Sequence, residues 1–93
     1  MNEEVTLRPE VQRFAFALER RLRKNEQGED AKSGWEHMSV ADCLERADEE
    51  REELRKAFDH GIQNPSVKRI RHEIEDTVNF LFFAWYNCEE ELS

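Results

Sequence analysis

The chain has 93 residues, of which 38% are hydrophobic and 39% charged, and its net charge at neutral pH is −8. This length corresponds to one domain with a modest hydrophobic core. The acidic balance repels nucleic-acid phosphates and argues against a protein that binds duplex nucleic acid. Glycine and proline are rare, with three and two residues, which favours long helices and therefore an all-α fold.

Neither membrane insertion nor secretion is expected of this chain. Its longest apolar run, residues 80–86, is too short to span a bilayer, and no signal-peptide pattern opens the sequence. The two cysteines, Cys43 and Cys88, are too few for a disulfide framework. Both occupy apolar helix positions, where free cysteines are commonly buried. We therefore expect a soluble cytoplasmic protein with free thiols.

Residues 1–8 are expected to form a flexible arm, and residues 9–93 a single all-α domain. Pro9 suits the first turn of a helix, where its missing N–H is not needed. The apolar residues that follow recur at three- and four-residue steps on one helical face: Val11, Phe14, Ala15, Leu18 and Leu22. Four basic residues lie near the C-terminal end of this predicted helix, where positive charges interact favourably with the helix dipole: Arg20, Arg21, Arg23 and Lys24. Two glycines and many polar side chains predict a loop over residues 25–34.

Ser39 is the predicted N-cap of a second helix, which ends near Gly61. The apolar face of this helix carries Val40, Cys43, Leu44, Ala47, Leu54, Ala57 and Phe58. Two charged residues, Glu50 and Arg51, interrupt the face at positions where the helical period expects apolar side chains. An acidic run over residues 48–53 therefore partly enters the buried side of the helix.

The third helix is predicted to begin at Asn64 and Pro65, a cap followed by a first-turn proline, and to end near Glu90. Its inner stripe consists of Val67, Ile70, Ile74, Val78, Leu81, Trp85 and Cys88. Residues 80–86 are apolar on every side of the helix, and a segment of this kind must be buried all round. Three helices of one small chain cannot surround it, so we expect a second copy to do so, in a homodimer or homotetramer.

Carboxylates are concentrated at two places on the predicted helices. The first is a run in which five of six consecutive residues are acidic, with Glu49, Glu50 and Glu53 at spacings that share a helical face. The second is Glu73 and Asp76, close to the apolar segment of their helix, where acids normally have a partner. If the two helices pack antiparallel, four or five carboxylates converge at a considerable electrostatic cost. A hard divalent cation, Mg²⁺ or alternatively Mn²⁺, relieves this cost by binding carboxylate oxygens.

The two acidic groups together resemble the signature of a known enzyme family. The pattern Glu49-Glu50-x-x-Glu53, then nineteen residues, then Glu73-x-x-Asp76 is similar to that of the all-α nucleoside triphosphate pyrophosphohydrolases, the MazG-like group. The resemblance covers roughly residues 32–86. It includes three flanking features: Leu54 after the third glutamate, Asn79-Phe80 after the aspartate, and the sequence KSGW from Lys32 to Trp35.

This resemblance implies an enzyme that cleaves a nucleoside or deoxynucleoside triphosphate between the α and β phosphates, in nucleotide-pool house-cleaning. The products would be the monophosphate and pyrophosphate. The implied ligands of Mg²⁺ are Glu50, Glu53, Glu73 and Asp76. Glu49 and Glu50 are the implied catalytic carboxylates, with Glu49 either binding metal or orienting the attacking water. Bound metal neutralises charge on phosphoryl oxygens and lowers the pKa of its water.

Four further residues are candidate substrate contacts, each with a structural alternative. Arg71 and Lys32 are candidates for phosphate binding, whereas structural pairing with acids of the second helix is the alternative for Arg71. Trp35 is a candidate for stacking on a nucleobase, or for pinning its loop to the core. Asn79 shares a face with Asp76 and either contacts substrate or is a hydrogen-bonded buried amide.

A non-catalytic protein is the alternative class: a helical dimerisation or adaptor protein, or a degenerate nucleotide sensor. It is favoured by the charged interruption at Glu50 and Arg51. Arg51 and Glu52 also stand where many MazG-like proteins have an apolar and a small residue, so Asp48 and Glu52 compete for roles in the site. In this class the acidic run is a solvated surface, as charged runs on helices usually are.

Overall fold

Three α-helices and one short 3-10 helix make up the part of the protein that the structure describes. The structure, a computed structural model, describes residues 4–26, 34–60 and 66–92. The elements are α1 (Pro9–Glu26), η1 (Trp35–His37), α2 (Val40–His60) and α3 (Val67–Leu92). No β-strand occurs within the described residues, and the predicted all-α class is therefore confirmed.

Serine hydroxyl groups cap both long helices of the C-terminal half. The Ser39 hydroxyl oxygen accepts a hydrogen bond from the Asp42 N–H at 3.1 Å, which confirms the predicted N-cap of α2. At the start of α3, the Ser66 hydroxyl oxygen accepts a hydrogen bond from the Arg69 N–H at 3.2 Å. The predicted start signal at Asn64 and Pro65 lies outside the described residues, and the cap falls on the serine that follows it.

The end of α1 lies further along the chain than the sequence predicts. The helix continues through Asn25 and Glu26, which were expected to begin a loop. A tertiary contact accounts for the extension, because the Asn25 side-chain amide donates a hydrogen bond to Asp76 of α3 at 3.4 Å. Contacts of this kind override local preferences that favour a loop.

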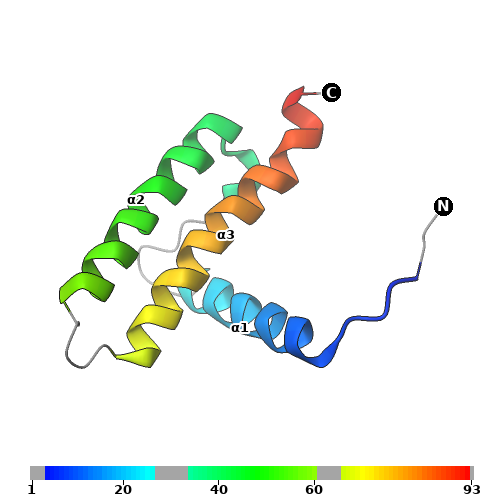
Figure 1. The fold of residues 1–93 in the computed structure, drawn as a ribbon. Coiled ribbons are helices and arrows are strands. Elements are labelled where there is room, and N and C mark those ends of the chain that lie inside the picture. The colour runs from blue at the N-terminus through cyan, green and yellow to red at the C-terminus, as the bar shows by residue number, and fades with distance from the viewer. Residues whose placement is uncertain (1–3, 27–33, 61–65, 93) are drawn as a thin grey trace.

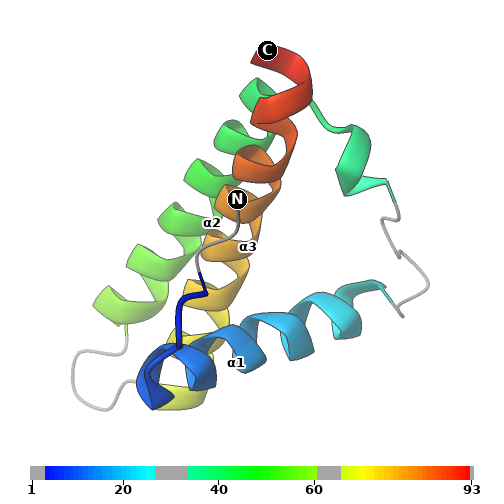
Figure 2. The same ribbon diagram turned by 90° about the vertical axis from the view of Figure 1, so that its right-hand side faces the viewer.

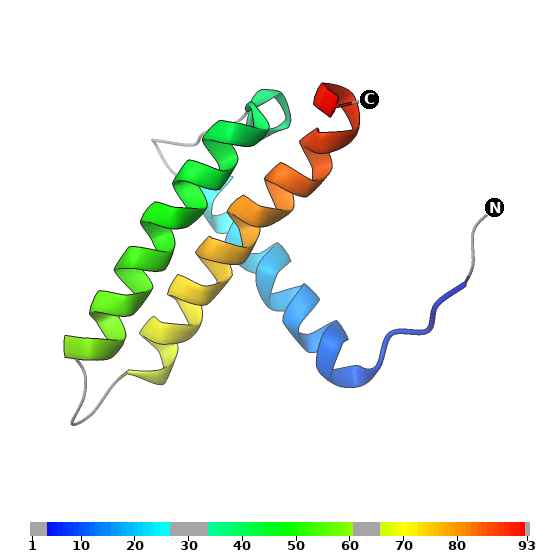
Figure 3. The ribbon, with the colours of Figure 1, turned by 45° about the horizontal axis from the view of Figure 1, so that its top comes forward.

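The helices α2 and α3 run antiparallel, side by side along most of their length (Figure 1). Helix α1 crosses α3 at a steep angle toward the middle of α3 (Figure 3), where its residues contact Asp76 and Asn79. Within the described parts of the chain, α1 contacts α3 but not α2, and η1 also contacts α3. Helix α1 and η1 lie on the same side of the α2–α3 pair (Figure 2), so this side of the pair is flanked by both.

A small core joins these elements near the middle of α3. Cys43, Phe83 and Ala84 are buried, and six partly buried residues pack against them: Leu22, Trp35, Met38, Val40, Phe80 and Phe82. Both cysteines are free thiols: Cys43 is fully buried, and Cys88 is half-buried. Burial raises the pKa of the Cys43 thiol, partly offset by its contact with the Asn87 amide, so the thiol is a neutral packing group.

The apolar segment of α3 is not enclosed by a single chain. Within residues 80–86, Leu81, Trp85 and Tyr86 have exposed fractions of 46%, 74% and 50%. The expectation that a second copy covers this segment stays a prediction. No helix in the part of the chain that the structure describes combines the length and the apolar character needed to cross a lipid bilayer.

Candidate metal centre and its cleft

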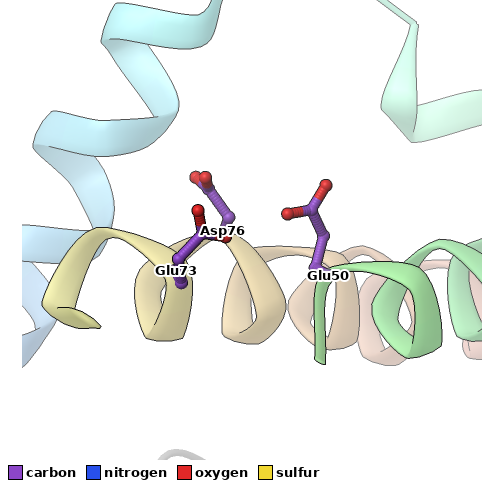
Figure 4. A group of neighbouring side chains, drawn as sticks. All are labelled: Glu50, Glu73 and Asp76. Carbon is purple, nitrogen blue, oxygen red and sulfur yellow. The ribbon is translucent and has the colours of Figure 1, made fainter. Parts of the chain in front are cut away.

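Three carboxylates from two helices meet beside the α2–α3 contact. They belong to Glu50 of α2 and to Glu73 and Asp76 of α3, and one oxygen atom of each lies within 4.8 Å of the others. All three side chains are partly buried and extend from the same side of the helix pair (Figure 4). The antiparallel packing and the three-residue spacing on α3 place them there, because residues three apart share a helical face.

Glu50 carries the electrostatic cost of this arrangement. Burial raises its pKa above the ordinary glutamate value, and the charges of Asp76 and Glu73 raise it further. Within the described residues, neither Glu50 nor Glu73 forms a salt bridge. Arg46 opposes the rise in the pKa of Glu50 without forming such a bridge with it. Two of the three carboxylates, those of Glu50 and Glu73, therefore have no cationic partner in a salt bridge among the described residues.

Asp76, in contrast, is paired with Arg21 of α1. The Arg21 Nε atom lies 2.8 Å from Asp76 Oδ1, and its Nη2 atom lies 3.0 Å from Oδ2. This bidentate pair raises the pKa of Arg21, since the carboxylate stabilises the charged guanidinium. In the sequence, the helix dipole alone accounts for Arg21, and the pair is not apparent because the two residues are 55 positions apart.

Most of the acidic run of α2 lies outside the cluster. Short-range pairs within the helix hold Glu49 to Arg46 at 3.6 Å, Asp48 to Arg51 at 4.0 Å and Glu53 to Lys56 at 3.8 Å. These pairs are exposed, so each contributes little to stability. The carboxylate of Glu53, 55% exposed beside its lysine, does not join the other predicted ligands. Three acids converge rather than four or five, and the solvated interpretation holds for this part of the run.

A cleft of about 970 Å³ opens beside the cluster. Its walls come from the end of α1, the η1 segment, the first half of α2 and the middle of α3. Its charged and amide lining residues include Lys24, Arg46, Glu49, Glu50, Asp76 and Asn79, and its aromatic lining residues are Trp35, Phe80 and Phe83. This volume is at the upper end of the range for small-molecule sites.

Arg46 lines the cleft and is not among the predicted site residues. Its guanidinium carbon lies 5.6 Å from the centre of the Phe80 ring, a cation–π distance. Arg46 precedes Glu49 and Glu50 by three and four residues, so the three share a face of α2. Arg46 therefore adds positive charge to a mostly acidic cleft wall beside the carboxylate cluster, a position that only the packing of α2 on Phe80 reveals.

Trp35 joins the wall of the cleft to the core. Its ring stacks on Phe83 with centroids 4.6 Å apart and meets Tyr86 edge-on at 5.3 Å. Its carbonyl oxygen accepts a hydrogen bond from the Asn87 amide at 2.9 Å, and its indole N–H donates to Glu26 at 3.4 Å. Through these contacts Trp35 attaches its segment to the core, which is the structural alternative given for this residue. Stacking of Trp35 on a nucleobase stays a prediction.

The other predicted substrate contacts lie in different places. Asn79 is buried, donates a hydrogen bond to the Leu18 carbonyl at 3.2 Å and also lines the cleft. Arg71 is exposed and lines a separate groove between α1 and α3, away from the carboxylates. Two helical positions separate it from Glu73, and residues two apart do not face the same way. Lys32 lies outside the described residues.

The donor set fits a hard divalent cation. Mg²⁺ binds oxygen ligands at about 2.1 Å, so oxygens on opposite sides of one ion are about 4.2 Å apart. The three carboxylate oxygens, within 4.8 Å of one another, need only a small inward movement to reach this span. The raised pKa of Glu50 indicates the same fit, since a cation would supply the charge that this carboxylate lacks.

No protein-family model matches the chain, and no match was found among curated proteins or among solved structures. The case for a function therefore depends on the site itself.

Proposed function

We propose that the protein is a Mg²⁺-dependent nucleoside triphosphate pyrophosphohydrolase of the MazG-like kind, with Mn²⁺ as an alternative cation. One observation carries the proposal: Glu50, Glu73 and Asp76, drawn from both halves of the acidic motif, come within 4.8 Å of one another next to a cleft. The volume and aromatic walls of the cleft suit a nucleotide.

In the proposed reaction, water adds to the α phosphorus and the bond from this phosphorus to the bridging oxygen breaks. The products are a nucleoside monophosphate and pyrophosphate. Glu50, Glu73 and Asp76 would hold the cation, which when bound neutralises phosphoryl charge and acidifies water. Glu49, next to Glu50 and on the cleft wall, is assigned to accept the proton of the attacking water. Removal of unwanted nucleotides from the cellular pool is the proposed role.

A panel of nucleoside and deoxynucleoside triphosphates with Mg²⁺ tests this proposal directly. Pyrophosphate and the matching monophosphate are expected in equal amounts, and EDTA is expected to stop their formation. Orthophosphate as the first product would mean that a different bond is cleaved. No product from any nucleotide, with either Mg²⁺ or Mn²⁺, would contradict the enzymatic assignment.

Arg46 is expected to bind the phosphate groups of the substrate in place of Arg71. Replacing Arg46 by glutamine should raise KM for the triphosphate about tenfold, because a hydrogen bond to a charged group contributes roughly 1.5–3 kcal/mol. The value of kcat should change less. Arg51→Gln is the matched control, since it removes the same charge from an exposed position of the same helix. Equal KM values for the two variants would remove Arg46 from the binding site.

A homo-oligomer is also part of the proposal, in line with the exposed apolar residues of α3. Trp85 and Leu92 have exposed fractions of 74% and 72% and, with Leu81, follow helical spacing along one face. Trp85→Glu is expected to convert a dimer or tetramer into monomers in size-exclusion chromatography with light scattering. Val5→Glu, at an exposed position outside the helices, should leave the assembly intact. A native protein that stays monomeric over a 100-fold range of protein concentration would contradict this expectation.

The non-catalytic alternative is favoured by a different observation. Arg21 already neutralises Asp76, and local pairs already accompany Glu49 and Glu53, so much of the acidic charge is balanced without a cation. An adaptor or nucleotide sensor of this kind would give no product in the nucleotide panel. It would also show no rise in melting temperature with millimolar Mg²⁺ or Mn²⁺, with or without nucleotide, because only a ligand of the folded state stabilises it.

A further inference from the structure

Both oxygens of the Asp76 carboxylate already accept hydrogen bonds from Arg21. Arg21 donates from Nε to Oδ1 at 2.8 Å and from Nη2 to Oδ2 at 3.0 Å. Only 21% of the Arg21 side chain and 16% of the Asp76 side chain are exposed. Charge-assisted pairs of this bidentate form are among the strongest that proteins make. The pair therefore holds Asp76 in one orientation and attaches α1 to α3.

The same Asp76 belongs to the three-carboxylate cluster with Glu50 and Glu73. A guanidinium and a divalent cation both bind carboxylate oxygens, and their positive charges repel each other at short distance. The pairing is selective, because within the described residues no salt bridge engages Glu50 or Glu73. Arg21 of α1 thus supplies positive charge directly to one member of the cluster, Asp76.

We propose that Arg21 occupies the Asp76 carboxylate of the candidate metal centre when no cation is bound and is exchanged for the divalent cation when the cation binds. This inference rests on the proposed metal centre. Cation binding and the α1–α3 bridge are then mutually exclusive, so binding loosens the attachment of α1 that Asn25 and Arg21 make to Asp76. The Mg²⁺ concentration that half-saturates the site, here called the midpoint, therefore increases with the strength of this bridge.

A Mg²⁺ titration of the melting temperature tests the exchange. In Arg21→Gln the titration midpoint is expected to fall about tenfold relative to the native protein, since the competing charged hydrogen bonds are gone. Arg21→Lys keeps the charge but loses the planar fork, and should give an intermediate midpoint. Arg20→Gln removes the same charge from an exposed neighbouring position and is the matched control, with the native midpoint expected.

The outcomes separate the exchange from the metal centre itself. An equal midpoint in Arg21→Gln and Arg20→Gln, with clear stabilisation by Mg²⁺ in both, would overturn the exchange and leave the metal centre in place. A weaker midpoint in Arg21→Gln than in the control would also overturn it, because Arg21 would then only support Asp76. Absence of any Mg²⁺ effect in all variants would overturn both.

Amide hydrogen exchange on the native protein provides a test that needs no variant. Addition of saturating Mg²⁺ is expected to accelerate exchange in α1 and to slow it in α2 around Glu50, because the bridge breaks while the cluster is stabilised. Slower exchange in α1 as well as α2 would show that the bridge survives cation binding, and would overturn the proposal even if Arg21→Gln does not fold.

Discussion

Replacing Glu50 by glutamine is expected to raise the melting temperature in the absence of divalent cations and to abolish the stabilisation that Mg²⁺ gives to the native protein. Burial and the charges of Asp76 and Glu73 act against an ionised Glu50, and the neutral amide removes this conflict. Relief of about 0.5 kcal/mol corresponds to roughly 2–4 °C for a domain of this size. Activity is expected to fall by about a hundredfold or more, because a cation ligand is lost.

The pH dependence of stability follows from the direction of the same pKa shift. The pKa of Glu50 is raised by folding, so the folded protein retains this proton to higher pH than the unfolded chain does. The protonated Glu50 side chain contributes favourably to the free energy of unfolding below the ordinary glutamate pKa of about 4.3. This contribution is lost as the pH rises to the raised pKa of the folded protein. In the presence of EDTA, the stability of the native protein minus that of Glu50→Gln should therefore decrease across this window. Mg²⁺ affinity should increase over the same window, because the cation displaces the proton.

Glu52→Gln is the matched control for these measurements. It makes the same chemical change at an exposed position two residues away on α2. The control should melt within about 2 °C of the native protein and keep its response to Mg²⁺, as surface substitutions usually change stability by less than about 0.5 kcal/mol. If Glu50→Gln destabilised the protein or kept its response to Mg²⁺, the carboxylate would not be an uncompensated cation ligand.

Replacing Asp76 by asparagine is expected to have the largest effect on both stability and activity. The change leaves the partly buried Arg21 guanidinium, 2.8 Å from Oδ1 in the native pair, without its anionic partner. A loss of about 2 kcal/mol is expected, which corresponds to a fall in melting temperature of roughly 8–16 °C. Pyrophosphate release should fall by about a hundredfold or more even at temperatures where the variant is folded, because the cation loses a ligand.

The exposed pair between Asp59 and Arg55, at 3.5 Å, offers the control for Asp76→Asn. Asp59→Asn should cost less than about 0.5 kcal/mol, since exposed pairs within a helix contribute little. The double variant Arg21→Gln/Asp76→Asn should lose less stability than the sum of the two single changes, because they remove the same bridge. Additive losses would show that Arg21 and Asp76 do not interact in solution, and full activity in Asp76→Asn would contradict the assigned site.

The helices are predictable from the sequence because their signals are local. The spacing of Leu18 and Leu22 marks the partly buried side of α1, and Ser39 is recognisable as a cap from its position before an apolar period. The meeting of Glu50 with Glu73 and Asp76 follows from the three-residue spacing on α3, once two neighbouring helices are taken to be antiparallel.

The remaining features of the site depend on contacts that no local pattern contains. Arg21 looks like a dipole-matching residue until α1 crosses α3 and brings it to Asp76. Glu53 has the spacing of a ligand, yet Lys56 one turn later pairs with its carboxylate at the surface. Arg46 acquires its place in the cleft only when α2 packs against Phe80. Tertiary packing therefore determines which charged residues of similar sequence context face the cleft.

A crystal structure of the native protein grown with Mn²⁺, with anomalous diffraction recorded near the manganese edge, tests the shared cation most directly. The expected result is a single strong peak bonded to carboxylate oxygens of Glu50, Glu73 and Asp76, with Arg21 no longer bridging Asp76. Separated carboxylates with no peak between them, at a Mn²⁺ concentration well above the millimolar range, would contradict the central claim.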